Sequence, residues 1–333
     1  MALHNISIKT KLSLILLLPI VALAVMIGMK VWDLQKKVDR QQELTELMDV
    51  SIVTNNLVHE IQKERGLSVG FLSSHGEKFG DDLVKQHQKS DEALATFNTK
   101  IKIESQKLKN LELAYQDQIK LSLEDLDKIS ATRKKIQGFE VEPSTVVAYY
   151  SGVTGDLLGI TEKALMSTHD THLLRELSTY LYFIQAKEKA GIERAIGAAG
   201  FSTGWTPALL NKFEDLITIQ KTYLDVFLTY ANSSESKQYT DMLKDPAFSS
   251  IDKMREVALK SLHTEGDMAT SVESETWFTA MSKKINLLKN FEDMLGKNVY
   301  EAATQGAKAA IFERDISLVI SIILILFVIL SII

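Results

Sequence analysis

The stretch AKEKAGIERAIGAAGFS, residues 186–202, decides the fold, because it reads as a helix that carries an arginine among small apolar side chains. On a helix, several of these small or aromatic residues share the face of Arg194: Phe183, Ala190, Gly191, Gly197, Ala198 and Phe201. Burying a guanidinium on such a face is costly unless a carboxylate or an anionic ligand accompanies it. The stretch therefore predicts a buried helix whose arginine pairs with, or binds, an anion.

A second stretch, HEIQKERGLSVGFLSS at residues 59–74, repeats this arrangement. Glu64-Arg65 aligns with Glu193-Arg194, and each pair is followed within a few residues by a phenylalanine and a serine. The chain therefore reads as two helical halves, each of which delivers one arginine.

The composition favours a helical protein over a sheet protein. The 333 residues include only four prolines and no cysteine, and residues 81–137 contain neither proline nor glycine. Apolar residues recur at helical spacing between breaks rich in turn residues. Because short connections between helices favour antiparallel neighbours, we expect an all-α fold of antiparallel helical bundles, with one four-helix bundle for each half.

The turn residues also predict where the helices lie. A long helix should end at Ser73, two helices should follow up to Gln137 with a turn near residues 105–110, and the last helix should begin near Glu275. Between them we expect helices over 144–166, 172–200 and 207–230, then a polar joint over 231–238, and helices over 239–244 and 249–262.

Two apolar runs, residues 12–29 and 316–333, each hold eighteen residues without a charge. A bilayer is spanned by about 20 apolar residues, so we expect transmembrane helices over 12–30 and 316–333. A cleaved signal peptide is the alternative for the first run, although its cleavage site would fall inside the apolar stretch.

The basic residues Lys9 and Lys11 place the tail of residues 1–11 in the cytoplasm. Residues 31–315 are then expected to form the periplasmic, extracytoplasmic sensor domain of a two-pass protein of the inner membrane.

The charge and the motifs argue against several functions. Once Lys9, Lys11 and Lys30 are set aside, 35 basic side chains face 43 acidic ones, which disfavours a nucleic-acid partner. His169, Asp170 and His172 are the one compact group of metal-ligand types, but they fall at a helix start that Asp170 can cap. We expect no metal, no cofactor and, without a phosphate loop or nucleophile elbow, no enzyme.

The segments QKERGLSVGFL at 62–72 and EKAGIERAIGAAGFSTG at 188–204 resemble the two hallmark segments of the nitrate- and nitrite-sensing (NIT) domain. This family occurs in bacterial chemoreceptors, sensor kinases and transcription antiterminators. The resemblance covers about residues 55–265 and implies two four-helix bundles that bind nitrate or nitrite through Arg65 and Arg194.

The residues themselves suit that chemistry. A guanidinium is flat and carries donors in a fork, so it can hold a flat oxyanion by two hydrogen bonds. Small residues, namely Gly191, Gly197, Ala198 and Ser68, are candidate walls of a tight pocket. Glu64 or Glu193 could offset the surplus positive charge only from across a bundle, because neighbouring residues point about 100° apart on a helix.

We therefore predict a transmembrane receptor, working as a homodimer, that senses nitrate or nitrite and signals through its last helix to a cytoplasmic output domain or partner, as a chemotaxis receptor does. One alternative is a bundle receptor for an organic ligand such as an amino acid or carboxylate. Another is a scaffold module in which both arginines are locked in ion pairs.

Overall fold

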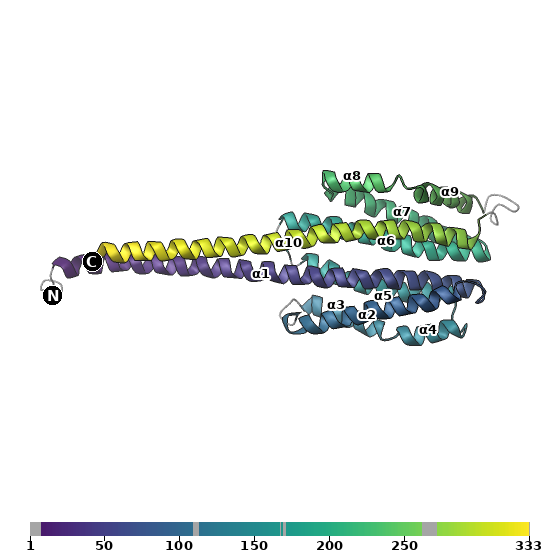
Figure 1. The fold of residues 1–333 in the computed structure, drawn as a ribbon, viewed down its shortest axis with the longest axis horizontal. Helices are drawn as coiled ribbons and strands as arrows, with labels where there is room; N and C mark the ends of the chain where they lie inside the picture. Colours follow the sequence, from purple (N-terminus) through teal and green to yellow (C-terminus); the bar gives the residue numbers. More distant parts are fainter. Residues whose placement is uncertain (1–7, 109–112, 167, 169–170, 262–271, 333) are drawn as a thin grey trace. The chain divides into compact units, whose positions relative to one another are not determined.

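The computed structural model describes residues 8–108, 113–166, 168, 171–261 and 272–332, with the side chains of all but 8–18, 105–108, 165, 329 and 331–332. These residues form helices joined by short turns, without strands, which confirms the all-helical prediction (Figure 1). The helices are α1 (Ile8–Ser73), α2 (Gly80–Leu108), α3 (Leu113–Leu126), α4 (Ile129–Gln137), α5 (Pro143–Met166), α6 (Thr171–Thr203), α7 (Pro207–Tyr230), α8 (Ser233–Met242), α9 (Pro246–Lys260) and α10 (Ser274–Ile332).

The helix boundaries differ from the prediction at two breaks. Residues 231–238 were expected to be a polar joint, but α8 already begins at Ser233, because Asn232 caps it together with Glu235. The segment up to Gln137 holds three helices, because the chain turns at Asp127 and Lys128 between α3 and α4. The predicted turn near residues 105–110 coincides with the end of α2 at Leu108, and residues 109–112 lie outside the described part of the chain.

The chain divides into two compact units, Met1–Thr45 with Glu301–Ile333, and Glu46–Tyr300, which we call the core unit. In the first unit, Lys37 of α1 pairs with Glu313 of α10 at 2.7 Å, and Arg314 donates to the side chain of Gln35 at 3.0 Å. Leu34 and Val38 are buried there. These contacts join the outer lengths of α1 and α10.

No helix is apolar over a length sufficient to cross a membrane in the part of the chain that the structure describes. The predicted transmembrane helices over 12–30 and 316–333 are therefore wrong for that part. Residues 12–18, 329 and 331–333 of the two runs lie outside the described side chains.

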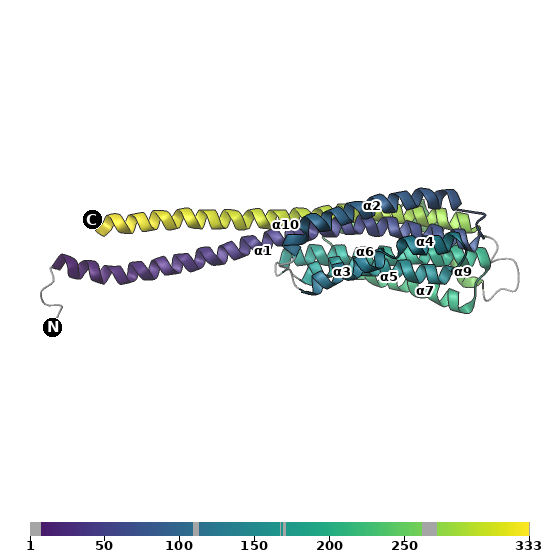
Figure 2. The same cartoon turned by 90° about the horizontal axis from the view of Figure 1, so that it is seen from below.

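Within the core unit the helices pack in two groups (Figures 1 and 2). In the first group α1 contacts α2, α4 and α5 through hydrogen bonds of Glu60 and Glu64, and α3 contacts α5. In the second group α6 contacts α7, α9 and α10. Each group thus consists of three long helices and a fourth position that two shorter helices fill in succession. The shorter helices are α3 and α4 in the first group and α8 and α9 in the second.

Each group is held by a fully buried carboxylate. Glu64 accepts from Nε and Nη2 of Arg133, both at 2.8 Å, and from the hydroxyl of Tyr150 at 2.6 Å. Glu193 accepts from Nε and Nη2 of Arg255 at 2.7 and 2.8 Å. Burial alone would raise the pKa of Glu64, but the hydrogen bonds and charge of Arg133 outweigh it and hold that pKa below its usual value.

We expect Arg133→Ala to destabilise the core unit by about 3 kcal/mol, because it leaves the buried Glu64 without its counter-charge. Urea unfolding followed by circular dichroism measures the change. Lys237→Ala, which removes a lysine of an exposed pair on α8, is the matched control and should leave the unfolding midpoint where it is. Equal midpoints for the two variants would contradict the role given to the Glu64–Arg133 pair.

Candidate functional site

The two arginines singled out by the sequence lie together inside the core unit. Arg65 of α1 is 0% exposed and Arg194 of α6 is 1% exposed. A Cβ atom built on Gly191 would lie 2.7 Å from Nη2 of Arg65, and one built on Gly66 would lie 2.9 Å from Nε of Arg194. The guanidinium of Arg65 therefore lies against Gly191 in the segment of Arg194, and that of Arg194 lies against Gly66 in the segment of Arg65. Glycine leaves the room that each guanidinium occupies.

Arg65 is bound by a carboxylate that comes from α6. Its Nη1 and Nη2 donate to the two oxygens of Glu188 at 2.6 and 3.3 Å, and Nη1 also donates to Ser151 at 2.9 Å. Glu188 accepts two further hydrogen bonds, from Gln62 at 2.6 Å and from Thr154 at 3.0 Å. The charge of Arg65 is thus neutralised, and the oxygens of Glu188 are fully used.

Arg194 lacks such a partner. It donates to the hydroxyl of Ser282 at 3.0 Å and to the carbonyl of Gln62 at 2.7 Å, and its guanidinium carbon lies 4.9 Å from the centre of the Phe278 ring. Among the residues described, no carboxylate lies within ion-pair distance of it. Burial, and next the charge of Arg65, lower the pKa of Arg194 well below its usual value. The arginine cluster, as we call Arg65, Arg194, Glu188 and Gln62, therefore holds one uncompensated positive charge.

Three buried polar atoms of the cluster have no hydrogen-bond partner among the described residues: Nε of Arg65, Nε of Arg194 and Oε1 of Gln62. Oγ of Ser68, one turn along α1 from Arg65, is also buried without such a partner. Nε of either arginine and the hydroxyl of Ser68 can donate a hydrogen bond. Unpartnered buried donors are costly, and an acceptor with negative charge would satisfy them.

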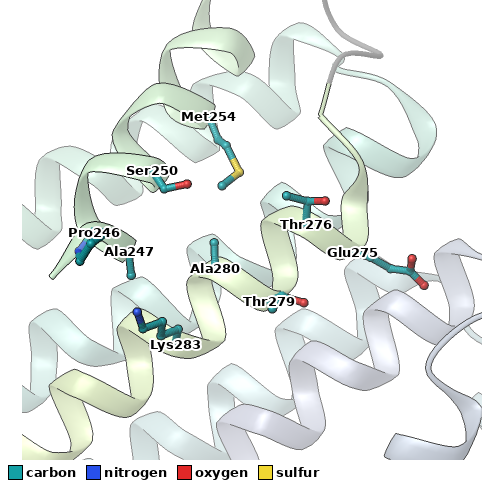
Figure 3. A pocket seen from close by; sticks show the side chains of 9 residues that line it. All are labelled: Pro246, Ala247, Ser250, Met254, Glu275, Thr276, Thr279, Ala280 and Lys283. Carbon is teal, nitrogen blue, oxygen red and sulfur yellow. The ribbon is translucent and has the colours of Figure 1, made fainter.

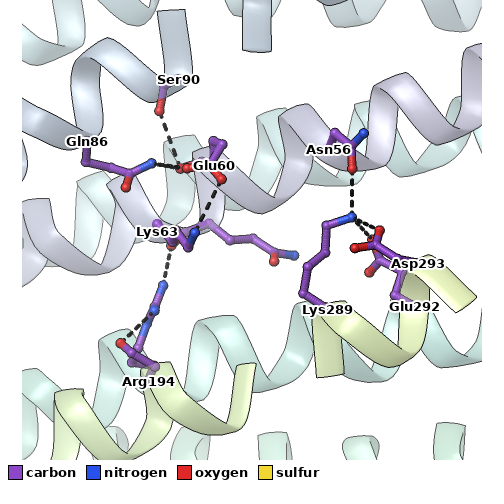
Figure 4. A network of polar contacts seen from close by, with 11 residues as sticks. Asn56, Glu60, Lys63, Gln86, Ser90, Arg194, Lys289, Glu292 and Asp293 are labelled. Carbon is purple, nitrogen blue, oxygen red and sulfur yellow. Dashed lines mark hydrogen bonds and ion pairs between the residues drawn. The ribbon is translucent and has the colours of Figure 1, made fainter. Parts of the chain in front are cut away.

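A cavity of about 240 Å³ lies beside Arg194. Figure 4 shows Arg194 pointing toward the turn of α1 that carries Glu60 and Lys63, with Gln86 and Ser90 of α2 beyond. The cavity is lined by Lys63, Leu67, Asp82, Lys85, Gln86, Lys89, Arg194, Phe278, Ser282 and Asn286. Four of these side chains are basic and one is acidic, so the cavity attracts anions.

The other candidate wall residues lie in different places. Ser68 is buried on α1, one turn beyond Arg65. A Cβ on Gly197 would lie 2.3 Å from the indole of Trp277, and the carbonyl of Ala198 accepts from Ser274 at 2.9 Å. Gly191 is therefore placed at a guanidinium, whereas Gly197 and Ala198 are placed where α6 packs on α10.

Sequence reasoning missed the carboxylate of the cluster. Glu64 and Glu193 bind Arg133 and Arg255, whereas Glu188 neutralises Arg65. Glu188 does not share the face of Arg194, which is why a reading of that one helix passed over it. Glu188 and Gly191 are three residues apart and therefore share a helix face, the face that meets Arg65 in the structure. That spacing could have indicated Glu188 as a residue of the site.

The group considered for a metal is only partly described. His169 and Asp170 lie outside the described residues, while His172 lies in the first turn of α6. The described ranges contain no group of three or more histidine, aspartate or glutamate side chains placed to hold a metal ion.

We expect Gly191→Ala to destabilise the core unit by about 1–3 kcal/mol, because the new methyl group must displace the buried guanidinium of Arg65 from Glu188. Gly152→Ala is the matched control: its Cβ meets nothing within 4 Å, and alanine should stabilise helix α5 by about 0.5–1 kcal/mol. Unfolding in urea compares the two, and a Gly191→Ala protein as stable as the Gly152→Ala protein would contradict the close approach.

Comparison with known proteins gives three matches. Residues 56–300 match the family model described as nitrate and nitrite sensing. A nitrate regulatory protein of Klebsiella oxytoca is 25% identical over 248 residues, which cover 74% of this chain and 61% of that protein. The solved structure of the NasR transcription antiterminator gives a TM-score of 0.74 at 21% identity, covers 88% of this chain and 82% of that chain, and so shows a shared fold.

The comparisons contradict the predicted function, partners and location. The relatives are a regulatory protein and an antiterminator, and the described residues hold no spanning helix, so the predictions of a transmembrane chemotaxis receptor, a membrane partner and a periplasmic location for residues 31–315 are wrong. The exclusion of nucleic acid is also wrong, since a transcription antiterminator shares the fold. That exclusion rested on the charge of one domain, and this chain spans only about 61% of the regulatory protein's length.

The predicted resemblance is confirmed, and it extends beyond the expected limit of residue 265. Because the match covers residues 56–300, well over half of the chain, this protein belongs to the nitrate and nitrite sensing family.

Proposed function

We propose that the arginine cluster binds one small oxyanion, nitrate or nitrite, and that the core unit acts as a sensor of that ion rather than as an enzyme. The observation that carries the proposal is the buried Arg194, which has no carboxylate within ion-pair distance among the described residues and lies beside an Arg65 that is already paired.

The charge of the cluster fits a monoanion. Arg65 and Arg194 contribute two positive charges, and Glu188 contributes one negative charge. A buried charge without a partner is costly, whereas a single bound anion would complete the balance. A dianion would leave the opposite imbalance, so the cluster favours ions with one charge.

The donors fit a flat ion. Nε of Arg194, Nε of Arg65 and the hydroxyl of Ser68 are buried donors without partners in the described part of the chain. Nitrate offers three acceptor oxygens in one plane, and guanidinium groups present their donors in a plane. The lysines that line the cavity beside Arg194 favour the approach of such an ion from solvent.

The alternatives fit less well. A scaffold with locked arginines describes Arg65, which Glu188 holds, but it does not describe Arg194. A receptor for amino acids or larger carboxylates needs room at both guanidinium groups, and these are 0% and 1% exposed, with the ring of Phe278 over Arg194.

We further propose that the two helix groups work as two four-helix bundles joined at the ion. One arginine comes from α1 and the other from α6, so an ion held by both would favour one arrangement of these helices over others. The names of the relatives, a nitrate regulatory protein and a transcription antiterminator, support a role in the nitrate-dependent regulation of gene expression.

Calorimetric titration of the full chain with nitrate tests the proposal. We expect binding, and we expect Arg194→Ala to weaken it about tenfold or more, since a hydrogen bond to a charged group contributes about 1.5–3 kcal/mol. Arg194→Lys should weaken binding less, because it keeps the charge and loses the fork. Arg175→Ala removes a half-exposed arginine of the same helix that lies outside the cluster, and it should leave the nitrate affinity unchanged. Equal nitrate affinity in all four proteins would refute the assignment.

The cavity beside Arg194 gives a second prediction. Lys85→Glu with Lys89→Glu should weaken nitrate binding at low salt, because the cavity would then repel the anion. The difference from the unsubstituted protein should shrink as salt rises from about 0.01 M to 1 M and the Debye length falls from about 30 to 3 Å. Titration at the two salt concentrations measures it, and a loss of affinity that is independent of salt would speak against an electrostatic role for these lysines.

A further inference from the structure

A second, larger cavity of about 540 Å³ lies among helices α6 to α10, and neither Arg65 nor Arg194 lines it. Pockets for small organic molecules measure about 300–1,000 Å³, so this cavity has the volume of a ligand site. The cavity lies at the break between α8 and α9, where Pro246 begins α9. Leu243 lines it before the break and Phe248 lines it after the break.

The walls of this cavity are apolar and partly aromatic. Phe183, Tyr239 and Leu288 are 0%, 5% and 5% exposed and form its inner wall, whereas Leu243 is 39% exposed. The rings of Phe183 and Tyr239 meet edge to face with centroids 6.4 Å apart, a geometry that a further aromatic ring can extend.

Three buried polar side chains also line it: Lys187, Gln220 and Lys284, which are 1%, 4% and 8% exposed. Lys187 is ion-paired with Glu292 at 2.5 Å. The side-chain oxygen of Gln220 accepts from the ammonium of Lys284 at 3.3 Å. The charge of Lys187 is therefore balanced, and Lys284 has a neutral amide as its hydrogen-bond partner.

Lys284 is the cation of this region that is least well compensated. Its nearest described carboxylate, Glu193, lies 3.9 Å away and is already bound by two nitrogens of Arg255 at 2.7 and 2.8 Å. Arg255 is further paired with Asp252 at 3.0 Å. Burial lowers the pKa of Lys284 to about 8, more than the charge of Glu193 raises it.

We propose that this cavity binds an aromatic monocarboxylate, whose carboxylate pairs with Lys284 and whose ring lies against Phe183, Tyr239 and Leu288. Lys284 shares the carboxylate of Glu193 with Arg255, so the carboxylate of a ligand would give Lys284 a counter-charge of its own. An aromatic ring would also bury apolar surface against these walls, which nitrate cannot do. The site is separate from the arginine cluster, so the inference stands or falls independently of nitrate binding.

Titration of the full chain with phenylacetate, and with the uncharged phenylacetamide, tests the proposal. We expect phenylacetate to bind with a Kd of about 1 mM or below and phenylacetamide to bind at least tenfold more weakly. Lys284→Met should weaken phenylacetate binding by about tenfold or more, while saturating nitrate and the Arg194→Ala change should leave it unaltered.

Lys283→Met is the matched control on the same helix. Figure 3 shows Lys283 in a separate groove between α9 and α10, with Ser250, Met254 and Ala280. Lys283 pairs with Asp245 at 2.9 Å, and its loss should not affect phenylacetate binding.

Ser249→Trp is a second variant that does not touch the buried lysine. Ser249 is exposed and lines the cavity, so the indole should obstruct entry while the fold is kept. The proposal is overturned by any of four results: no binding of phenylacetate up to about 10 mM, equal binding of phenylacetamide, full binding to both Lys284→Met and Ser249→Trp, or displacement by nitrate.

Discussion

The core unit depends on the burial of two guanidinium groups side by side with a single carboxylate between the helices that carry them. Arg65 and Glu188 come from α1 and α6, so their fork of hydrogen bonds joins the two helix groups across the interior. The same fork leaves Arg194 with neutral partners only: a hydroxyl, a carbonyl and an aromatic ring. One ion pair thus joins α1 to α6 and occupies the carboxylate of the cluster, so that the charge of Arg194 is left without a counter-charge.

The two halves of the chain bury a Glu-Arg dipeptide in the same way. The residue before each central arginine is a glutamate that faces away from it into its own helix group, where an arginine of an interrupted helix binds it: Glu64 with Arg133, and Glu193 with Arg255. The Glu-Arg dipeptide therefore serves two purposes, because its glutamate holds one group together and its arginine faces the other group. The surroundings then differ, with Tyr150 beside Glu64 and Lys284 near Glu193.

Much of this arrangement was predictable from the sequence, for stated physical reasons. Helical spacing and turn residues predicted a helix over residues 207–230, which is α7 in the structure, and the repeated Glu-Arg segments indicated two halves. Glu188 was not found, because it lies on a different face of α6 from Arg194 and its partner Arg65 comes from a distant segment of the chain. The membrane spans were predicted from two runs of eighteen uncharged residues, whereas no helix in the described part of the chain is apolar over a sufficient length.

The reciprocal contacts of the two glycines have a consequence for how this site can change over time. Arg194 lies over the position of Gly66, and Arg65 lies over the position of Gly191. A smaller residue in place of either arginine leaves a gap, and a side chain added at either glycine displaces the guanidinium that lies against it. We therefore expect two pairs of residues to vary together among relatives, Arg65 with Gly191 and Arg194 with Gly66. Each pair joins one residue from each half of the chain.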